Sequence, residues 1–231
     1  MVCAADKDYR VVIESADLVV HLVEMSEQSL DRISAHLQTG NTLDIPIVGS
    51  EVLTFSTPAN QMENRTPLLQ IPGTSRMLTL FWVSEKGFLG DKSKNATYFP
   101  HMNLKRLDVE VGHRTFRREM NFSKEDRAEK LVLAYQQTVN SIGGGMDNNF
   151  IKKDVWASSQ TLHNFDLSSS GFYAPCLNMA ASFRPEEHQS LSIGYVFGKA
   201  PTEAHQLVAL LEKDQKLRIM PDFSLQLADD M

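Results

Sequence analysis

The pattern of hydrophobic and polar positions predicts a chain built mainly from short β-strands. In residues 11–23, Asp17 and His21 fall on one face of an extended segment and four apolar side chains fall on the other; these are Ala16, Leu18, Val20 and Leu22. This alternation is typical of a half-buried strand. Residues 77–83 are apolar on both faces, as expected for a strand deep within a sandwich. Further strands are predicted at residues 52–55, 107–111, 161–167, 178–183, 191–197, 207–211 and 217–219.

Two segments carry helical signals instead. The first runs from a capping serine to a terminating glycine, and the second from a capping box to a run of three glycines. The residues with these signals are Ser26, Leu30, Ile33, Leu37 and Gly40 in the first segment, and Ser123, Leu131, Tyr135, Val139 and glycines 143–145 in the second. The helices come singly between strands rather than after each strand. We therefore expect a mainly β protein, an antiparallel jelly-roll β-sandwich with two short helices in its loops.

Composition excludes several functional classes. The 231 residues include 23 Lys and Arg against 29 Asp and Glu, for a net charge of -6 at pH 7. Because phosphate binding requires concentrated basic side chains, we expect no direct sequence-specific binding of nucleic acid. No apolar run approaches the roughly 20 residues that cross a bilayer, so no membrane span is predicted. Charged residues among the first ten argue against a signal peptide and favour an intracellular protein.

A search for catalytic or metal-binding side chains yields no candidate. The seven histidines are spread along the chain without HxH, HxxxH or HExxH spacing. Cys3 and Cys176 supply neither a disulfide framework nor a metal site. Glycines 143–145 lack the Lys and Ser or Thr of a phosphate loop. We therefore predict no catalytic, cofactor-binding or metal-binding residue and no cofactor, which favours a structural or binding role.

Several blocks of sequence occur in an order that resembles one protein family. The blocks are YRVVIESADL at residues 9–18, DIPI at 44–47, TFSTP at 54–58, and the segments 75–104, 157–167 and 191–211. The segment 75–104 is the most specific, and it keeps Arg76, Phe88, Gly90, Lys94, Asn95, Phe99, His101, Asn103 and Leu104. It departs from the family pattern at Ala96, Thr97 and Met102. Together the blocks resemble the C-terminal jelly roll of the double jelly-roll major capsid proteins of Polinton (Maverick) elements and adintovirus-like viruses.

The resemblance implies a structural capsid protein without enzymatic activity. It implies location in the virion, in pseudo-hexagonal capsomers of a viral or virus-like transposon particle. The implied partners are a homotrimer or capsomer neighbours, the N-terminal jelly roll of the same capsid protein, and penton or minor capsid proteins. Residues 57–74, 86–99 and 143–155 are the candidate loops for subunit contacts. Phe88, Phe99 and Phe165 are expected to be core aromatics.

The resemblance also sets domain limits and leaves two alternatives. We expect a disordered leader at residues 1–8, the jelly-roll domain at 9–220 as the second half of a larger protein, and a flexible tail at 221–231. A half-protein should expose a large apolar patch on one side of its sandwich. One alternative is a carbohydrate- or ligand-binding β-sandwich without catalysis, which a cleft lined by Trp82 or Trp156 would favour. The other is a jelly-roll enzyme, which needs at least three His and carboxylate side chains around one point.

Overall fold

The computed structural model describes residues 15, 24–120, 122, 129–141, 151–167 and 188–229. The predicted strands at 11–23 (apart from Ser15) and 178–183, the capping Ser123, glycines 143–145 and the leader at 1–8 lie outside the described residues. Ten strands and four helices are formed by the part of the chain that is described.

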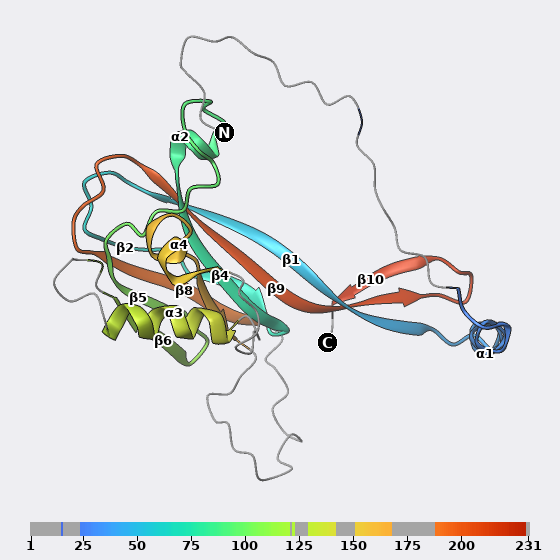
Figure 1. Cartoon of the computed structure of the whole chain (residues 1–231). Helices are drawn as coiled ribbons and strands as arrows, with labels where there is room; N and C mark the ends of the chain where they lie inside the picture. Colours follow the sequence, from blue (N-terminus) through green and yellow to red (C-terminus); the bar gives the residue numbers. More distant parts are fainter. Residues whose placement is uncertain are drawn as a thin grey trace.

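The strands form two five-stranded antiparallel sheets (Figure 1). The first sheet contains β1 (Leu43–Thr57), β4 (Ser75–Ser84), β7 (His163–Asp166), β9 (His205–Ile219) and β10 (Leu225–Asp229). Its order is β1-β9-β4-β7, and β10 also pairs with β9. The second sheet contains β2 (Glu63–Arg65), β3 (Leu69–Pro72), β5 (Leu104–Val111), β6 (Arg114–Glu119) and β8 (His188–Phe197). Its order is β2-β8-β5-β6, with β3 also on β8.

The strand order is that of a jelly roll. β2 and β3 pair with successive parts of β8, so together they act as one interrupted strand. The strands pair in a nested order. β5 pairs with β6, the strands outside that pair in the sequence (β4 and β7) pair next, then β2 and β3 with β8, and finally β1 with β9. Eight strand positions in two antiparallel sheets match the jelly-roll plan. The predicted fold class is therefore confirmed.

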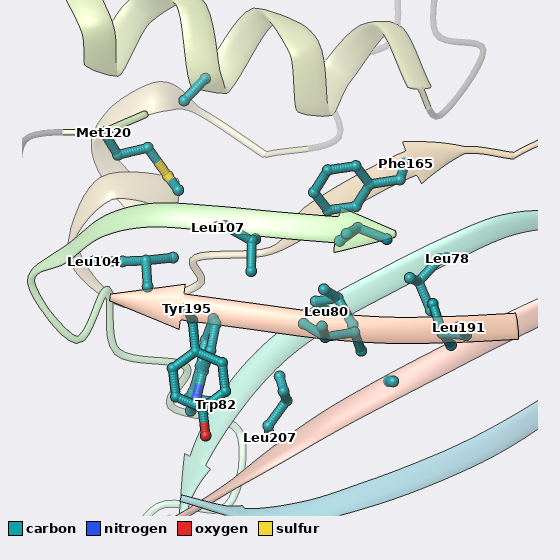
Figure 2. Close-up of a cluster of buried hydrophobic side chains, with 14 of the residues drawn as sticks. Leu78, Leu80, Trp82, Leu104, Leu107, Met120, Phe165, Leu191, Tyr195 and Leu207 are labelled. Atoms are coloured by element: carbon teal, nitrogen blue, oxygen red, sulfur yellow. The ribbon is translucent and has the colours of Figure 1, made fainter. Parts of the chain in front are cut away.

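The core lies between the two sheets, where alternate side chains of facing strands meet (Figure 2). Its largest fully buried members are Trp82, Trp156, Phe165 and Phe197. The sequence pattern at residues 107–111 predicted this arrangement, since Leu107, Val109 and Val111 are buried. The whole cluster of buried apolar side chains comes from both sheets and from the helices that close one edge of the sandwich.

Four helices connect or cover the sheets: α1 (Glu27–Gln38), α2 (Glu85–Phe88), α3 (Glu129–Ser141) and α4 (Lys153–Ser158). The predicted cap of α1 is present, because the Ser26 side chain accepts a hydrogen bond from the Ser29 amide. Gly40 follows that helix with a φ of 83°, as a terminating glycine should. α3 packs on β6 and β7, the edge strands of the two sheets. No helix among the described residues is both long and apolar enough to cross a bilayer.

Several sequence predictions change in the folded chain. The two strands predicted at 207–211 and 217–219 are parts of the single strand β9. β6, α2 and α4 were not predicted. Within the segment expected to be a flexible tail, Leu225–Asp229 forms β10 on β9. Short polar strands such as β2 were missed because their pairing on β8 is decided by tertiary contacts rather than by an apolar pattern.

The first sheet extends well beyond the second. β1 and β9 pair in unbroken register over 15 residues, whereas β4 reaches only as far as Lys213 on β9. Past that point β10 takes the place of β4 beside β9. We call the resulting three-stranded ribbon the arm; it comprises residues 43–48, residues 214–219 and β10. Figure 1 shows it projecting from the sandwich with α1 at its free end.

Candidate functional site

The three loops predicted to make subunit contacts differ in their secondary structure and in how much of each is described. Residues 57–74 contain β2 and β3, so part of this segment belongs to the second sheet. Residues 86–99 continue from α2 as a series of turns. Of residues 143–155, those up to 150 lie outside the described residues, and the remainder leads into α4. Residues 86–99 are therefore the best-described candidate loop.

The 86–99 loop is held by a helix cap and an ion pair, and it presents exposed apolar side chains. The Ser84 hydroxyl accepts from the Gly87 amide at 3.1 Å and caps α2. The Lys94 ammonium pairs with the Glu203 carboxylate at 3.0 Å, which lowers the pKa of Glu203. Leu89 is 77% exposed, and Phe88 and Tyr98 are also exposed. A fixed loop with exposed apolar side chains is suited to contact another protein.

The three phenylalanines expected in the core have different environments. Phe165 is buried between the sheets, as predicted. Phe99 is half-buried and packs on Phe81, with ring centroids 4.4 Å apart. The prediction for Phe88 is wrong, because its side chain is exposed at the end of α2. The motif identified the position of the turn but not the direction of the side chain.

Neither tryptophan lines a ligand cleft. Trp82 and Trp156 are both almost completely buried. The Trp82 indole N–H donates to the Thr57 hydroxyl at 3.2 Å, and the Trp156 indole N–H donates to the Leu162 carbonyl at 2.7 Å. These hydrogen bonds satisfy the polar end of each ring inside the core. The observation that would have favoured a carbohydrate-binding module is therefore not found at these two residues.

The described histidines are not gathered at one point. His163 is buried in the core between the rings of Trp82 and Trp156, whereas His101 stacks on Phe122 with centroids 4.5 Å apart. Across the described ranges, no three His, Cys, Asp or Glu side chains are placed to hold a metal ion. Sequence analysis singled out no histidine as a ligand, and the structure adds none within those ranges.

A buried polar cluster joins the two sheets beneath α3. Arg118 of β6 is buried; its guanidinium donates to the Asn164 carbonyl of β7 and to the Thr138 hydroxyl of α3 at 3.3 Å. Its Cζ lies 4.0 Å from the centre of the Phe165 ring. Burial lowers the pKa of Arg118 to about 10. Burial, with a smaller effect of the Arg118 charge, lowers the pKa of His163 to about 3. Neither group is open to solvent, so this cluster ties the sandwich together.

The outer face of the second sheet carries ion pairs. Asp108 of β5 accepts from Arg117 at 2.7 Å and lies 2.9 Å from Arg106, with little of its side chain exposed. Nearby, Arg65 pairs with Glu110 at 2.6 Å. Because charged residues of both signs alternate across these strands, this face is well hydrated and is unsuited to an apolar partner.

The arm differs from the sandwich in that its two faces have opposite character. Side chains two residues apart lie on one face of a strand. The face that continues the core side of the sheet carries seven aliphatic residues: Leu43, Ile45 and Ile47 of β1, Leu217 and Ile219 of β9, and Leu225 and Leu227 of β10. We call these seven residues the apolar face of the arm. They form cross-strand rows, since Ile45 is opposite Leu217 and Leu217 is opposite Leu227.

The opposite face of the arm carries charged side chains together with Val48, which is 54% exposed. The Arg218 guanidinium donates two hydrogen bonds to the Asp44 carboxylate, at 2.7 and 2.9 Å, and this lowers the pKa of Asp44. Among the apolar face residues, Leu225 is 65% exposed, Leu227 is 59% exposed and Ile45 is 39% exposed. These exposed aliphatic side chains lie on the arm, beyond the area that the second sheet covers, whereas the large apolar patch expected on one side of the sandwich stays a prediction.

The apolar face of the arm is separated from the core. Gln215 is buried and its side chain lies over Gly49, where an added Cβ atom would clash with its Oε1. Sequence analysis did not find this face because its strands were predicted as separate short pieces or as a tail. The alternation of Leu225 and Leu227 with polar residues is the signal that could have indicated β10.

No protein-family model matches the chain, and no curated protein matches it by sequence. Among solved structures, the mavirus major capsid protein is 10% identical with a TM-score of 0.45, over 80% of this chain and 41% of that one. A cryo-EM structure of the Sputnik virophage is 10% identical with a TM-score of 0.47, over 81% and 38%. PBCV-1 VP54, fitted into a reconstruction of Sputnik, is 11% identical with a TM-score of 0.49, over 90% and 55%. The chain thus spans about half or less of the length of these solved chains.

Proposed function

We propose that this chain is a structural capsid subunit. The observation that carries the proposal is the jelly-roll strand order together with the position of the family-like blocks along it. Residues 54–57 end β1, residues 77–83 lie in β4, and residues 191–197 lie in β8. Blocks that resemble one capsid family in sequence therefore lie on β1, β4 and β8, three strands of the fold that this family uses, in the same order along the chain.

The finer features of the proposal come from the resemblance. The jelly roll corresponds to the C-terminal half of a double jelly-roll major capsid protein of the Polinton or adintovirus-like type. It pairs with the N-terminal jelly roll of the same protein, and three such subunits form a pseudo-hexagonal capsomer of the virion. The start of the domain at residue 9 belongs to the same proposal, whereas β10 carries the first sheet beyond the expected limit at residue 220. Such a role requires stable sheets and lateral contacts rather than an activated side chain.

The test is assembly with the missing half. The purified chain is mixed with the presumed N-terminal jelly roll and followed by analytical ultracentrifugation and negative-stain microscopy. We expect trimers of the paired jelly rolls with pseudo-hexagonal outline. A chain that binds no N-terminal half and forms no higher assembly would contradict the proposal.

The contact loops are tested with single charged substitutions. Leu68→Asp and Leu89→Asp each place a carboxylate on an exposed leucine of a candidate loop. Leu133→Asp is the matched control, because Leu133 is an exposed leucine of α3 outside the three loops. We expect the two loop variants to lose trimers and the control to keep them, with unchanged circular dichroism in all three. Normal trimers in both loop variants would remove these two positions from the interface.

A further inference from the structure

The outer side of β1 is the longest strand edge without a pairing partner among the described residues. β1 is the last strand of its sheet, and its only partner among the described strands is β9, in unbroken register over 15 residues. Figure 1 shows β1 along the outside of the sheet. By contrast, α3 packs on the edge strands β6 and β7, and β2, β3 and β10 have only three to five residues each. An unpaired edge presents rows of N–H and C=O groups to which another strand can bind.

Pro46 shows which residues of β1 direct their backbone groups to this edge. Proline has no N–H, so within a sheet it is accommodated where that group would point away from the neighbouring strand. β1 stays paired with β9 on both sides of Pro46. The even-numbered residues of β1 therefore direct their N–H and C=O groups to the free edge, and the odd-numbered residues direct theirs to β9. The even-numbered side chains are exposed at every position from 44 to 56.

The middle of this edge lacks the features that protect natural edge strands. Such strands are usually guarded by lysine, by proline or by a bulge. Residues 48–56 read VGSEVLTFS, with no lysine, no proline and a single charged residue, Glu51. On the outer face of the sheet, Val48 and Val52 are 54% and 60% exposed. This part of β1 is therefore suited to pair with a strand of similar aliphatic and hydroxyl-bearing side chains.

The edge is complementary to a second copy of itself. A twofold axis brings the same residues of two copies together, and two β1 edges that meet in this way are antiparallel. With the axis at Val52, the Val52 residues of the two copies are opposite each other. Ser50 is then opposite Thr54, and Val48 is opposite Ser56. All five residues are even-numbered, so each directs its N–H and C=O groups towards the other copy, and Ser–Thr pairs are favourable across strands.

Two features of the sequence favour this register over its neighbours. Pro46 and Pro58 each lie six positions from Val52, so pairing about that residue runs over 48–56 before a proline is reached on either side. The same register places Glu51 opposite Leu53. An axis at Glu51 would instead place two carboxylates directly opposite each other, which is unfavourable.

We propose that two copies of this chain form a twofold-symmetric dimer through the β1 edge. Residues 48–56 of the two copies pair antiparallel about Val52 and join the two first sheets into one continuous sheet. Backbone hydrogen bonds hold the pair, and the two Val52 side chains contact each other on the outer face. The interface is confined to one strand edge, so it is small and its formation depends on protein concentration. The proposal requires only this chain and does not depend on the capsid role.

The first test is sedimentation equilibrium of the full chain alone over a range of concentrations. We expect a monomer–dimer equilibrium. Val52→Pro should lower the association constant about tenfold or more, because it removes an N–H donor from both copies at the axis. The edge accepts proline at this position for the same reason that it accepts Pro46. Val52→Thr is the matched control, which keeps the N–H and the branched side chain, and it should change the association constant by no more than about twofold.

Three results of this test would overturn the proposal. They are a chain that stays monomeric throughout the range, a chain that forms trimers by itself, and an association constant that is equal in Val52→Pro and Val52→Thr. Tryptophan fluorescence of the buried core verifies that each variant remains folded.

The second test measures the register and needs no proline variant. In a chain with Cys3→Ser and Cys176→Ser, a single cysteine at position 48, 52 or 56 carries a nitroxide, and the distance between the labels of the two copies is measured by electron paramagnetic resonance. Since a strand rises about 3.4 Å per residue, we expect equal distances of roughly 25–30 Å at 48 and 56 and a much shorter distance at 52.

The control position is 227 on the apolar face of the arm, where Leu227→Cys carries the same label. A shortest distance at 227 would place the contact between copies on the arm and would overturn the proposal. Unequal distances at 48 and 56 would also overturn it, because the axis would then lie away from Val52.

Discussion

The sandwich and the arm share two continuous strands, yet they are stabilised in different ways. In the sandwich, β1 and β9 have a second sheet above them, and side chains such as Trp82 and Leu207 are buried on all sides. In the arm, β10 pairs with β9 and α1 contacts β1, but no second sheet lies above them, and aliphatic side chains remain exposed. The sandwich is therefore held by packing between layers, whereas the arm is held by strand pairing and a surface ion pair.

Because of this difference, the sandwich and the arm should respond differently to substitutions. Close packing makes the sandwich intolerant of changes in volume, since a cavity costs free energy in proportion to its size. The arm has little packing to lose, so substitutions there should affect its contacts and local opening rather than global unfolding. Four substitutions sharpen this comparison, beginning with the largest expected effect.

Trp82→Ala should cause the largest loss of stability. Trp82 packs edge-on against Tyr195 and Phe197, with ring centroids 5.4 and 6.0 Å away, and its removal leaves a large cavity. We expect the free energy of unfolding to fall by about 3–5 kcal/mol in urea denaturation. The control Phe223→Ala, at an exposed aromatic in the turn between β9 and β10, should stay within about 0.5 kcal/mol. Similar losses for the two variants would contradict the distinction between the regions.

His163 should make the stability of the sandwich depend on pH. Its pKa is lowered to about 3 by burial, so the folded state holds it neutral while the unfolded state takes up a proton below the ordinary value of 6.5. The contribution of the neutral His163 side chain to the free energy of unfolding is fully present above pH 6.5, and it is lost as the pH falls towards 3. The expected slope is about 1.4 kcal/mol per pH unit within that window.

The measurement is chemical denaturation at several pH values between 7 and 4. His163→Leu should remove this part of the pH dependence, whatever its effect on absolute stability. His36→Leu, at an exposed histidine of α1, should keep the slope of the original chain. A slope that is equal in the two variants would show that His163 is not the responsible group.

Arg118→Ala should have a smaller effect, centred on the closed edge of the sandwich. The substitution removes the hydrogen bonds to Thr138 and to the Asn164 carbonyl and the contact with Phe165. We expect a loss of about 1–3 kcal/mol, because a buried acceptor is left without a partner. Arg118→Met should recover the packing part of the loss. Arg65→Ala, in the exposed pair with Glu110, provides the control and should change stability little.

Asp44→Asn should have the smallest effect and should act on the arm alone. Without the charged hydrogen bonds from Arg218, amide exchange of residues 43–45 and 217–219 should become faster, while the global unfolding midpoint stays constant. Since the pKa of Asp44 is lowered, the contribution of this pair is lost as the pH falls through the acidic range. Glu51→Gln, at an exposed position of β1 in the sandwich, should leave exchange in the arm unchanged.

The sequence carried enough information to predict the sandwich. Strands with one strongly apolar face, such as β5 with Leu107, Val109 and Val111, are buried on that face in the fold. The capping serine of α1 is also in place. These elements could be predicted because the signals for them, an alternation of apolar side chains and a capping residue, lie within a few neighbouring residues of the sequence. The jelly-roll topology was predicted from the order of the sequence blocks that resemble the capsid family.

The candidate site was predicted less well than the fold. Residues 86–99 do form a surface loop, but Phe88 points outward instead of into the core. Arg118 belongs to a short basic group with Arg114 and Arg117, and such a group in the sequence indicates an ordinary solvated surface. Its burial depends on α3 packing over the edges of both sheets, which no local pattern specifies.

The sequence by itself determined which segments have one apolar side and therefore must be buried in a β-sandwich. Only the tertiary structure decided how far each strand continues. β9 runs through the charged stretch between Leu211 and Leu217 because β1 and then β10 pair with its backbone, and backbone pairing does not depend on side-chain hydrophobicity. The arm and its apolar face exist for that reason. They arise from long-range pairing between residues that are more than 170 positions apart, such as Asp44 and Arg218.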